Sequence, residues 1–134
     1  MEVRTSVVPR RSVLIVDKLQ ETREVLRTAL ASRGAEIFEA SRADEGLQMA
    51  RQHRPDVIVL DLDFAAESGE GVAAGFDAQS QADEIPLVLL GNARRTRQIF
   101  SAGQFVSKPY HYAPLIRKIE QLLDEAQQLP FRSA

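Results

Sequence analysis

The chain has 134 residues, of which 44% are hydrophobic and 27% are charged, values that fit one globular domain and exclude a fibrous or disordered class. The formal net charge of −2 and the scattered basic residues argue against nucleic-acid binding by this domain alone. The lack of cysteine excludes a disulfide framework and a thiolate metal site, and no apolar stretch has the length of a membrane span or a signal-peptide core, so we expect a cytoplasmic protein without membrane contact.

The first half of the chain predicts two strands that are each followed by a helix. In chain order these are a strand at 12–17, a helix from 19 to 34, a less buried strand at 36–40 and a helix at 41–53. The first helix is indicated by apolar residues at helical spacing, and Gly34 is the residue type that commonly follows a last turn. Ser41 is a suitable cap for the second helix.

The second half opens with an apolar run at 56–61 that begins and ends in a carboxylate. Its four consecutive large aliphatic residues are too few for a helix and too continuous for a half-exposed strand, so the run predicts a buried central strand. The pattern then predicts a loop around 67–71, a weak helix at 72–82, a strand at 86–90, a short helix at 93–102, a strand at 104–108 and a final helix that holds Pro114 in its first turn.

Strand and helix alternate five times, which predicts an α/β fold in three layers with a doubly wound, five-stranded parallel sheet. In such a sheet, ligands bind beyond the carboxyl ends of the strands. Four of the predicted strands end in or next to Asp17, Asp61, Gly91 and Lys108. Two carboxylates and one ammonium from separate strands therefore indicate a site, although each aspartate could instead cap the helix that follows it.

At this point the sequence resembles the receiver domain of two-component response regulators. The matching pieces are Val13-Leu14-Ile15-Val16-Asp17, Pro55-Asp56-Val57-Ile58-Val59-Leu60-Asp61, Ile85-Pro86 and Phe105-Val106-Ser107-Lys108-Pro109-Tyr110. Their order and spacing together carry the resemblance, which covers residues 12–126 between a leader at 1–11 and a tail at 127–134. The resemblance implies a flavodoxin-like fold with strand order 2-1-3-4-5.

The resemblance also implies a role for each matching polar residue. Asp61 is expected to accept a phosphoryl group from a histidine kinase or a phosphotransfer protein. Asp17, Asp61 and the backbone carbonyl of Asp63 are expected to hold Mg²⁺, which takes hard oxygen ligands and keeps several waters. Lys108 is expected to pair with the phosphorylated aspartate, because a carboxylate attacks a polyanionic phosphoryl group only where cations neutralise the charge.

Two positions depart from the family pattern. A second acid is usual after the first strand, and here that residue is Lys18; a serine or threonine is usual after the fourth strand, and here it is Gly91. In the family, the hydroxyl that Gly91 lacks usually couples phosphorylation to a change of the output surface. Phe105 stands at the position of the switch aromatic and has no hydroxyl. The segment between the fourth strand and Lys108 is short, which predicts a truncated fourth helix.

Lys18 changes the charge balance of the predicted site. A typical pocket with three acids and one lysine carries −2, whereas Asp17, Asp61, Lys18 and Lys108 sum to zero. One unit-charge pair at ~4 Å is worth ~4 kcal/mol at an effective dielectric of about 20, so Lys18 predicts weakened Mg²⁺ affinity. The sequence leaves three alternatives open: Lys18 points to solvent, its ammonium partly replaces the metal, or Asp63 turns its carboxylate inward as a substitute ligand.

The leading functional hypothesis is a receiver domain in phosphorelay signalling with Asp61 as acceptor, and not an enzyme. The alternative is a degenerate receiver that works as a phosphorylation-independent docking or dimerisation module. Both hypotheses allow a homodimer. An aspartyl-phosphatase interpretation of Asp61-Leu62-Asp63 is weaker, because that motif belongs on a first strand. A flavin site is weaker still, because the turn after the first strand lacks a phosphate cradle.

Overall fold

The computed structural model describes residues 11–127 of the chain. The predicted leader, apart from Arg11, and the predicted tail, apart from Gln127, lie outside the described residues. The domain boundaries at 12 and 126 therefore stay predictions, although the described elements begin and end close to them.

A five-stranded parallel sheet forms the middle of the fold, in the order β2-β1-β3-β4-β5, which confirms the predicted topology. Every residue of β1, β3 and β4 is buried, as expected of continuous apolar runs in strands covered on both faces. The neighbouring strand β2 is more exposed, as its sequence predicted. The strands are β1 Ser12–Val16, β2 Glu36–Ala40, β3 Val57–Asp61, β4 Leu87–Leu90 and β5 Gln104–Val106.

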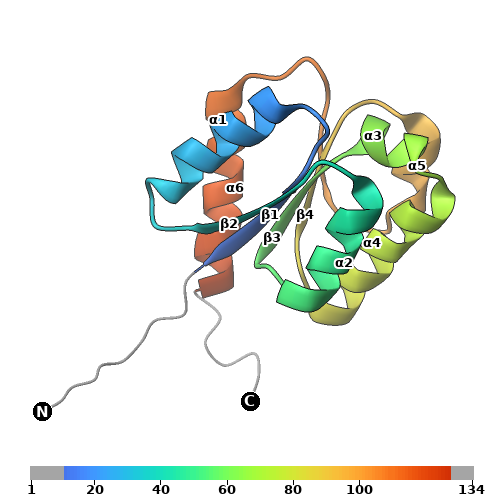
Figure 1. The fold of residues 1–134 in the computed structure, drawn as a ribbon, viewed down its shortest axis with the longest axis horizontal. Helices are drawn as coiled ribbons and strands as arrows, with labels where there is room; N and C mark the ends of the chain where they lie inside the picture. The colour runs from blue at the N-terminus through green and yellow to red at the C-terminus, as the bar shows by residue number, and fades with distance from the viewer. Residues whose placement is uncertain (1–10, 128–134) are drawn as a thin grey trace, which may run out of the picture.

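Helices cover both faces of this sheet and complete the three predicted layers (Figure 1). The helices α1 and α6 cover one face, while α2, α3, α4 and α5 cover the other. Alternate strand residues serve the two cores: Val13 and Val59 pack toward α1 and α6, whereas Leu14 and Ile58 pack toward the other four helices. The helices are α1 Gln20–Ala31, α2 Ala43–His53, α3 Leu62–Glu67, α4 Glu70–Asp83, α5 Arg94–Ile99 and α6 Tyr112–Gln127.

Helix α3 corrects the prediction of an irregular segment after the central strand. It begins directly after Asp61, whose side chain accepts a hydrogen bond from the backbone N–H of Phe64 and so caps the helix. Leu62 and Ala65 are the buried residues of this helix. The predicted loop is reduced to Ser68 and Gly69, because α4 begins earlier than expected. Six residues were too short for the helical period to be recognised in the sequence.

Several element ends also differ from the prediction, and the first is that of α1, which ends at Ala31 with Ser32 as its C-cap residue rather than at 34. Ser41 does not cap α2, which begins at Ala43 with Arg42 at the N-cap position and no side-chain cap hydrogen bond. Helix α5 ends at Ile99 rather than at 102, because Phe100 adopts an extended backbone. This six-residue helix confirms the predicted truncation. Strand β5 ends at Val106, two residues before Lys108.

Candidate functional site

The carboxyl ends of the strands bring together the polar residues that the sequence placed there. Asp17 follows β1, Asp61 ends the adjacent strand β3, Gly91 follows β4 and Lys108 lies two residues beyond β5. The two aspartates are deeply buried, with 2% and 4% of their surface exposed. Buried carboxylates are rare unless they are paired or bind a cation, so this edge of the sheet is the candidate site.

Asp61 holds two partners with its two carboxylate oxygens. Oδ1 accepts a hydrogen bond from the N–H of Phe64 at 2.9 Å, and Oδ2 accepts one from Nζ of Lys108 at 2.6 Å. The first bond fixes the carboxylate at the start of α3, and the second is a charge-assisted bond. Capping and a charged site were separate alternatives for Asp61 in the sequence, and the structure combines them.

Lys108 bridges two carboxylates. Its ammonium lies 2.6 Å from Asp61 Oδ2 and 3.1 Å from Asp63 Oδ2, and its backbone carbonyl accepts a hydrogen bond from Asn92 at 3.0 Å. Burial by itself would lower the pKa of Lys108, but the hydrogen bonds to the two carboxylates outweigh it and raise that pKa above the usual lysine value. Lys108 therefore stays charged at neutral pH.

Asp17 is less well compensated. Its Oδ1 accepts the N–H of Leu19 at 2.9 Å, and its backbone carbonyl accepts a bond from Arg23 at 2.7 Å. This is a local turn and not a helix cap, because Leu19 itself is the N-cap residue of α1. Burial raises the pKa of Asp17, and the negative charge of Asp61 adds to this rise, although the Leu19 N–H and the cations Lys108 and Arg23 oppose it.

Lys18 pairs with Glu67 at the rim of the site. Its Nζ donates to both carboxylate oxygens, at 3.2 and 3.0 Å, and about half of each side chain is exposed. The side chain of Lys18 is thus exposed, as one of the alternatives had it, and it is paired with Glu67, while a metal-replacing role of its ammonium stays a prediction. Sequence reasoning missed Glu67, since nothing local relates two residues that lie 49 positions apart.

Asp63 faces the site with its side chain. Its backbone was expected to supply a metal ligand, but Asp63 lies in the first turn of α3, where a carbonyl points along the helix axis. Its carboxylate instead reaches Lys108 and lies beside Gly91: a Cβ placed on Gly91 would stand 2.8 Å from Asp63 Oδ2. The carboxylate of Asp63 is therefore turned inward and contacts Lys108, while its use as a substitute metal ligand stays a prediction.

The side chains at the site fit Mg²⁺, although they supply few ligands. Asp17 and Asp61 offer hard carboxylate oxygens, and Oδ2 of Asp17 has no hydrogen-bond donor between residues 11 and 127. The raised pKa of Asp17 is consistent with a buried charge that a cation would relieve. In that same part of the chain, no group of three or more histidine, cysteine or acidic side chains could hold a metal, so water would have to complete the shell.

Phe105 lies on β5, where it pairs with Leu89 of β4, and it is half-buried. The guanidinium carbon of Arg97 stands 4.3 Å from the ring centroid, which is a cation–π contact between β5 and α5. The aromatic at this position is therefore held by a charged residue of the shortened helix.

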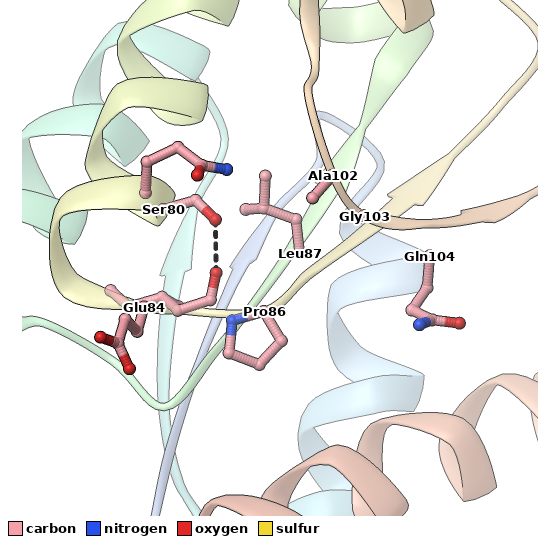
Figure 2. A pocket seen from close by; sticks show the side chains of 9 residues that line it. Ser80, Glu84, Pro86, Leu87, Ala102, Gly103 and Gln104 are labelled. Carbon is pink, nitrogen blue, oxygen red and sulfur yellow. Dashed lines mark hydrogen bonds between the residues drawn. The ribbon is translucent and has the colours of Figure 1, made fainter. Parts of the chain in front are cut away.

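A hollow lies at the opposite end of the sheet, where β4 and β5 begin (Figure 2). Ser80 borders it, and its hydroxyl donates to the carbonyl of Ile85 at 2.5 Å. The hollow is lined by Ser80, Gln81, Glu84, Ile85, Pro86, Leu87, Ala102, Gly103 and Gln104. Glu84 is the one charged side chain among these residues, so the hollow lacks the paired charges of the carboxyl edge.

Among the described helices, none has the length and apolar character needed to cross a membrane.

Comparison with known proteins identifies the family pattern. A family model described as the response regulator receiver domain matches residues 13–120. The probable transcriptional regulator ycf27 of Guillardia theta is 31% identical over 126 residues, a match that covers 92% of this chain and 50% of that protein. The polar-differentiation response regulator DivK of Brucella anthropi is 27% identical over 122 residues, covering 87% of this chain and 98% of DivK.

The chain spans about half the length of several curated relatives that it matches, including ycf27 and the E. coli regulatory protein KdpE, of which it covers 51%. Among solved structures, the chemotaxis protein CheY4 of Vibrio cholerae aligns with a TM-score of 0.69 at 24% identity, covering 85% of this chain and 99% of CheY4. A CheY-like receiver domain protein of Methanospirillum hungatei aligns with a TM-score of 0.75 at 17% identity, covering 90% and 98%. These structural matches establish the shared fold.

Proposed function

The chain belongs to the response regulator receiver domain family of two-component signalling, and from this premise we propose that Asp61 accepts a phosphoryl group from a histidine kinase or a phosphotransfer protein. The observation that carries the proposal is the position of Asp61: a buried carboxylate at the end of the central strand, 2.6 Å from the Lys108 ammonium. No other carboxylate of the described sheet strands combines this burial with such a cation.

The transfer makes one bond and breaks one. A carboxylate oxygen of Asp61 attacks phosphorus, and the bond from phosphorus to the phosphohistidine nitrogen breaks, leaving its electron pair on the imidazole. Both reactants are anionic, so the step depends on positioning and on cations that neutralise the phosphoryl oxygens. Lys108 is placed to supply that charge, while the Phe64 N–H keeps the carboxylate oriented.

Receiver domains generally bind Mg²⁺ at the phosphorylation site. In this chain, Asp17 and Asp61 would hold the ion through their carboxylates, whereas the backbone carbonyl of Asp63 lies in the first turn of α3 and is not offered to it. When bound, Mg²⁺ supplies further neutralisation of the phosphoryl oxygens. The third carboxylate that faces the site, that of Asp63, is paired with Lys108, and Lys18 lies at the rim, so we expect millimolar rather than micromolar Mg²⁺ to be needed.

Intact-mass spectrometry after incubation with acetyl phosphate tests the proposal. We expect a Mg²⁺-dependent gain of one phosphoryl mass that is absent in Asp61→Ala. Asp56→Ala is the matched control, because Asp56 flanks the opposite end of β3 and accepts hydrogen bonds from Ser12 there. That variant should keep the adduct. No adduct at high Mg²⁺, from protein that circular dichroism shows to be folded, would refute the proposal.

A further inference from the structure

Gly91 has no side chain, and the carboxylate of Asp63 occupies the space beside it. A Cβ at this position would stand 2.8 Å from Oδ2 of Asp63, closer than real Cβ contacts come. The backbone of Gly91 has φ +130, a conformation that residues with a side chain rarely adopt. A side chain at 91 and the carboxylate of Asp63 in its present place therefore exclude each other.

The carboxylate in that volume is also an ion-pair partner. Asp63 Oδ2 lies 3.1 Å from the Lys108 ammonium, which is already held by Asp61 at 2.6 Å. One positive charge thus faces two negative charges from the same turn of chain. A phosphoryl group on Asp61 would bring further negative charge to this ammonium, and the nearby Asp63 carboxylate would repel it.

We infer that Asp63 is a positioning residue of this site: its carboxylate, seated in the volume that Gly91 leaves empty, acts as a built-in anion that competes with an incoming phosphoryl group for Lys108. The inference rests on the proposed function of Asp61. With 45% of its side chain exposed, Asp63 has room to turn away once the phosphoryl group arrives. Asp63 and Gly91 act as a matched pair that holds Lys108 in the unmodified protein.

The first experiment measures the initial rate of adduct formation from acetyl phosphate by intact mass. Asp63→Asn keeps the shape and removes the competing charge, so the rate should rise about fivefold or more. Glu67→Gln is the matched control, because it also removes one carboxylate charge on α3, but from the partner of Lys18 rather than of Lys108. That variant should stay within about twofold of the wild-type rate.

The second experiment needs no phosphorylation. Urea unfolding in the presence of EDTA gives the stability of Gly91→Ala, of Asp63→Ala and of the double variant. In the wild-type background, Gly91→Ala adds backbone strain and also displaces Asp63 from Lys108; in the Asp63→Ala background, only the strain remains. The alanine at 91 should therefore raise the unfolding equilibrium constant by a factor at least about threefold smaller in the second background.

The outcomes separate this inference from the proposed function. Absence of an adduct in every folded variant refutes the proposed function, and the unfolding cycle then decides whether Asp63 occupies the Gly91 volume. An adduct that forms in the wild type and faster in Asp63→Asn, with the rate of Glu67→Gln unchanged, supports the inference. Equal adduct rates in wild type and Asp63→Asn overturn it, and so does an additive unfolding cycle.

Discussion

The two ends of the same sheet satisfy their polar groups in different ways. At the amino end, the partners are hydroxyl and backbone groups: the Ser80 hydroxyl donates to the carbonyl of Ile85, and Asp56 accepts hydrogen bonds from the backbone N–H and the hydroxyl of Ser12. At the carboxyl end, Lys108 reaches Asp61 across 47 residues, and Asp17 lies buried with its charge incompletely compensated. The amino end is built for stability. The carboxyl end holds buried charge, and buried charged groups of this kind cluster at functional sites.

The largest change in stability is expected when the ion pair at the carboxyl end of the sheet is broken. Lys108→Met leaves buried Asp61 without its cation, so the free energy of unfolding should fall by about 2 kcal/mol, less than for a fully buried pair because 31% of the lysine side chain is exposed. Urea denaturation at pH 7 measures this. Lys118→Met is the control, since that exposed ammonium bonds only to Gln104 among the described residues, and it should change stability by less than about 0.5 kcal/mol.

The next substitution is expected to increase the free energy of unfolding rather than to lower it. The raised pKa of Asp17 means that the folded protein binds its proton more tightly than the unfolded chain does, so this group contributes stability at low pH that is lost as the pH rises through the raised value. In EDTA at pH 7, Asp17→Asn should therefore increase the free energy of unfolding by about 1 kcal/mol. The gain should shrink as the pH falls from the raised pKa of Asp17 to the usual aspartate value, and it should be absent below that value.

Asp44 provides the reference for that pH dependence. A hydrogen bond from Arg42 lowers the pKa of Asp44, so its contribution to stability is present above the unfolded pKa and is lost as the pH falls through the lowered value. Asp44→Asn should accordingly never stabilise the protein between pH 3 and 7. If Asp17→Asn follows the same course as Asp44→Asn, the uncompensated charge at the carboxyl end is refuted.

A third prediction concerns the amino end and sharpens the comparison. Ser80→Ala removes the hydrogen bond to Ile85 at the border of the hollow (Figure 2), and should cost about 1 kcal/mol of stability. Because Ser80 lies at the opposite edge of the sheet from Asp61, the rate of adduct formation from acetyl phosphate should be unchanged at full folding. A slowed rate in folded Ser80→Ala protein would show that the two ends are coupled.

The smallest effect is expected at the rim of the site. The Lys18–Glu67 ion pair is about half exposed, so Lys18→Met should alter the free energy of unfolding by less than about 0.5 kcal/mol. Removing the ammonium should nevertheless strengthen Mg²⁺ binding, because one positive charge leaves the rim of the site while its partner Glu67 keeps a negative charge there. Isothermal titration calorimetry with MgCl₂ measures this. Weaker Mg²⁺ binding in Lys18→Met would mean that Lys18 helps to shape the site.

The sequence by itself determined the layered fold and the composition of the site edge. Continuous apolar runs such as 57–60 specify buried parallel strands, and strand–helix alternation then dictates which chain ends meet. Asp17, Asp61, Gly91 and Lys108 could therefore be placed on one rim without coordinates. These inferences succeeded because they depend on hydrophobic periodicity, which is a local property of the chain.

Only the tertiary structure decided the partners within that rim. The Lys18–Glu67 pair, the helix capped by Asp61 and the carboxylate of Asp63 beside Gly91 depend on side-chain directions and on distances between segments far apart in sequence. A charged side chain pairs with the nearest opposite charge that packing makes available, and no local pattern encodes which one that is. The charged residues of the site can thus be identified from the sequence, while the packing of α3 against the strand ends determines which of them are paired.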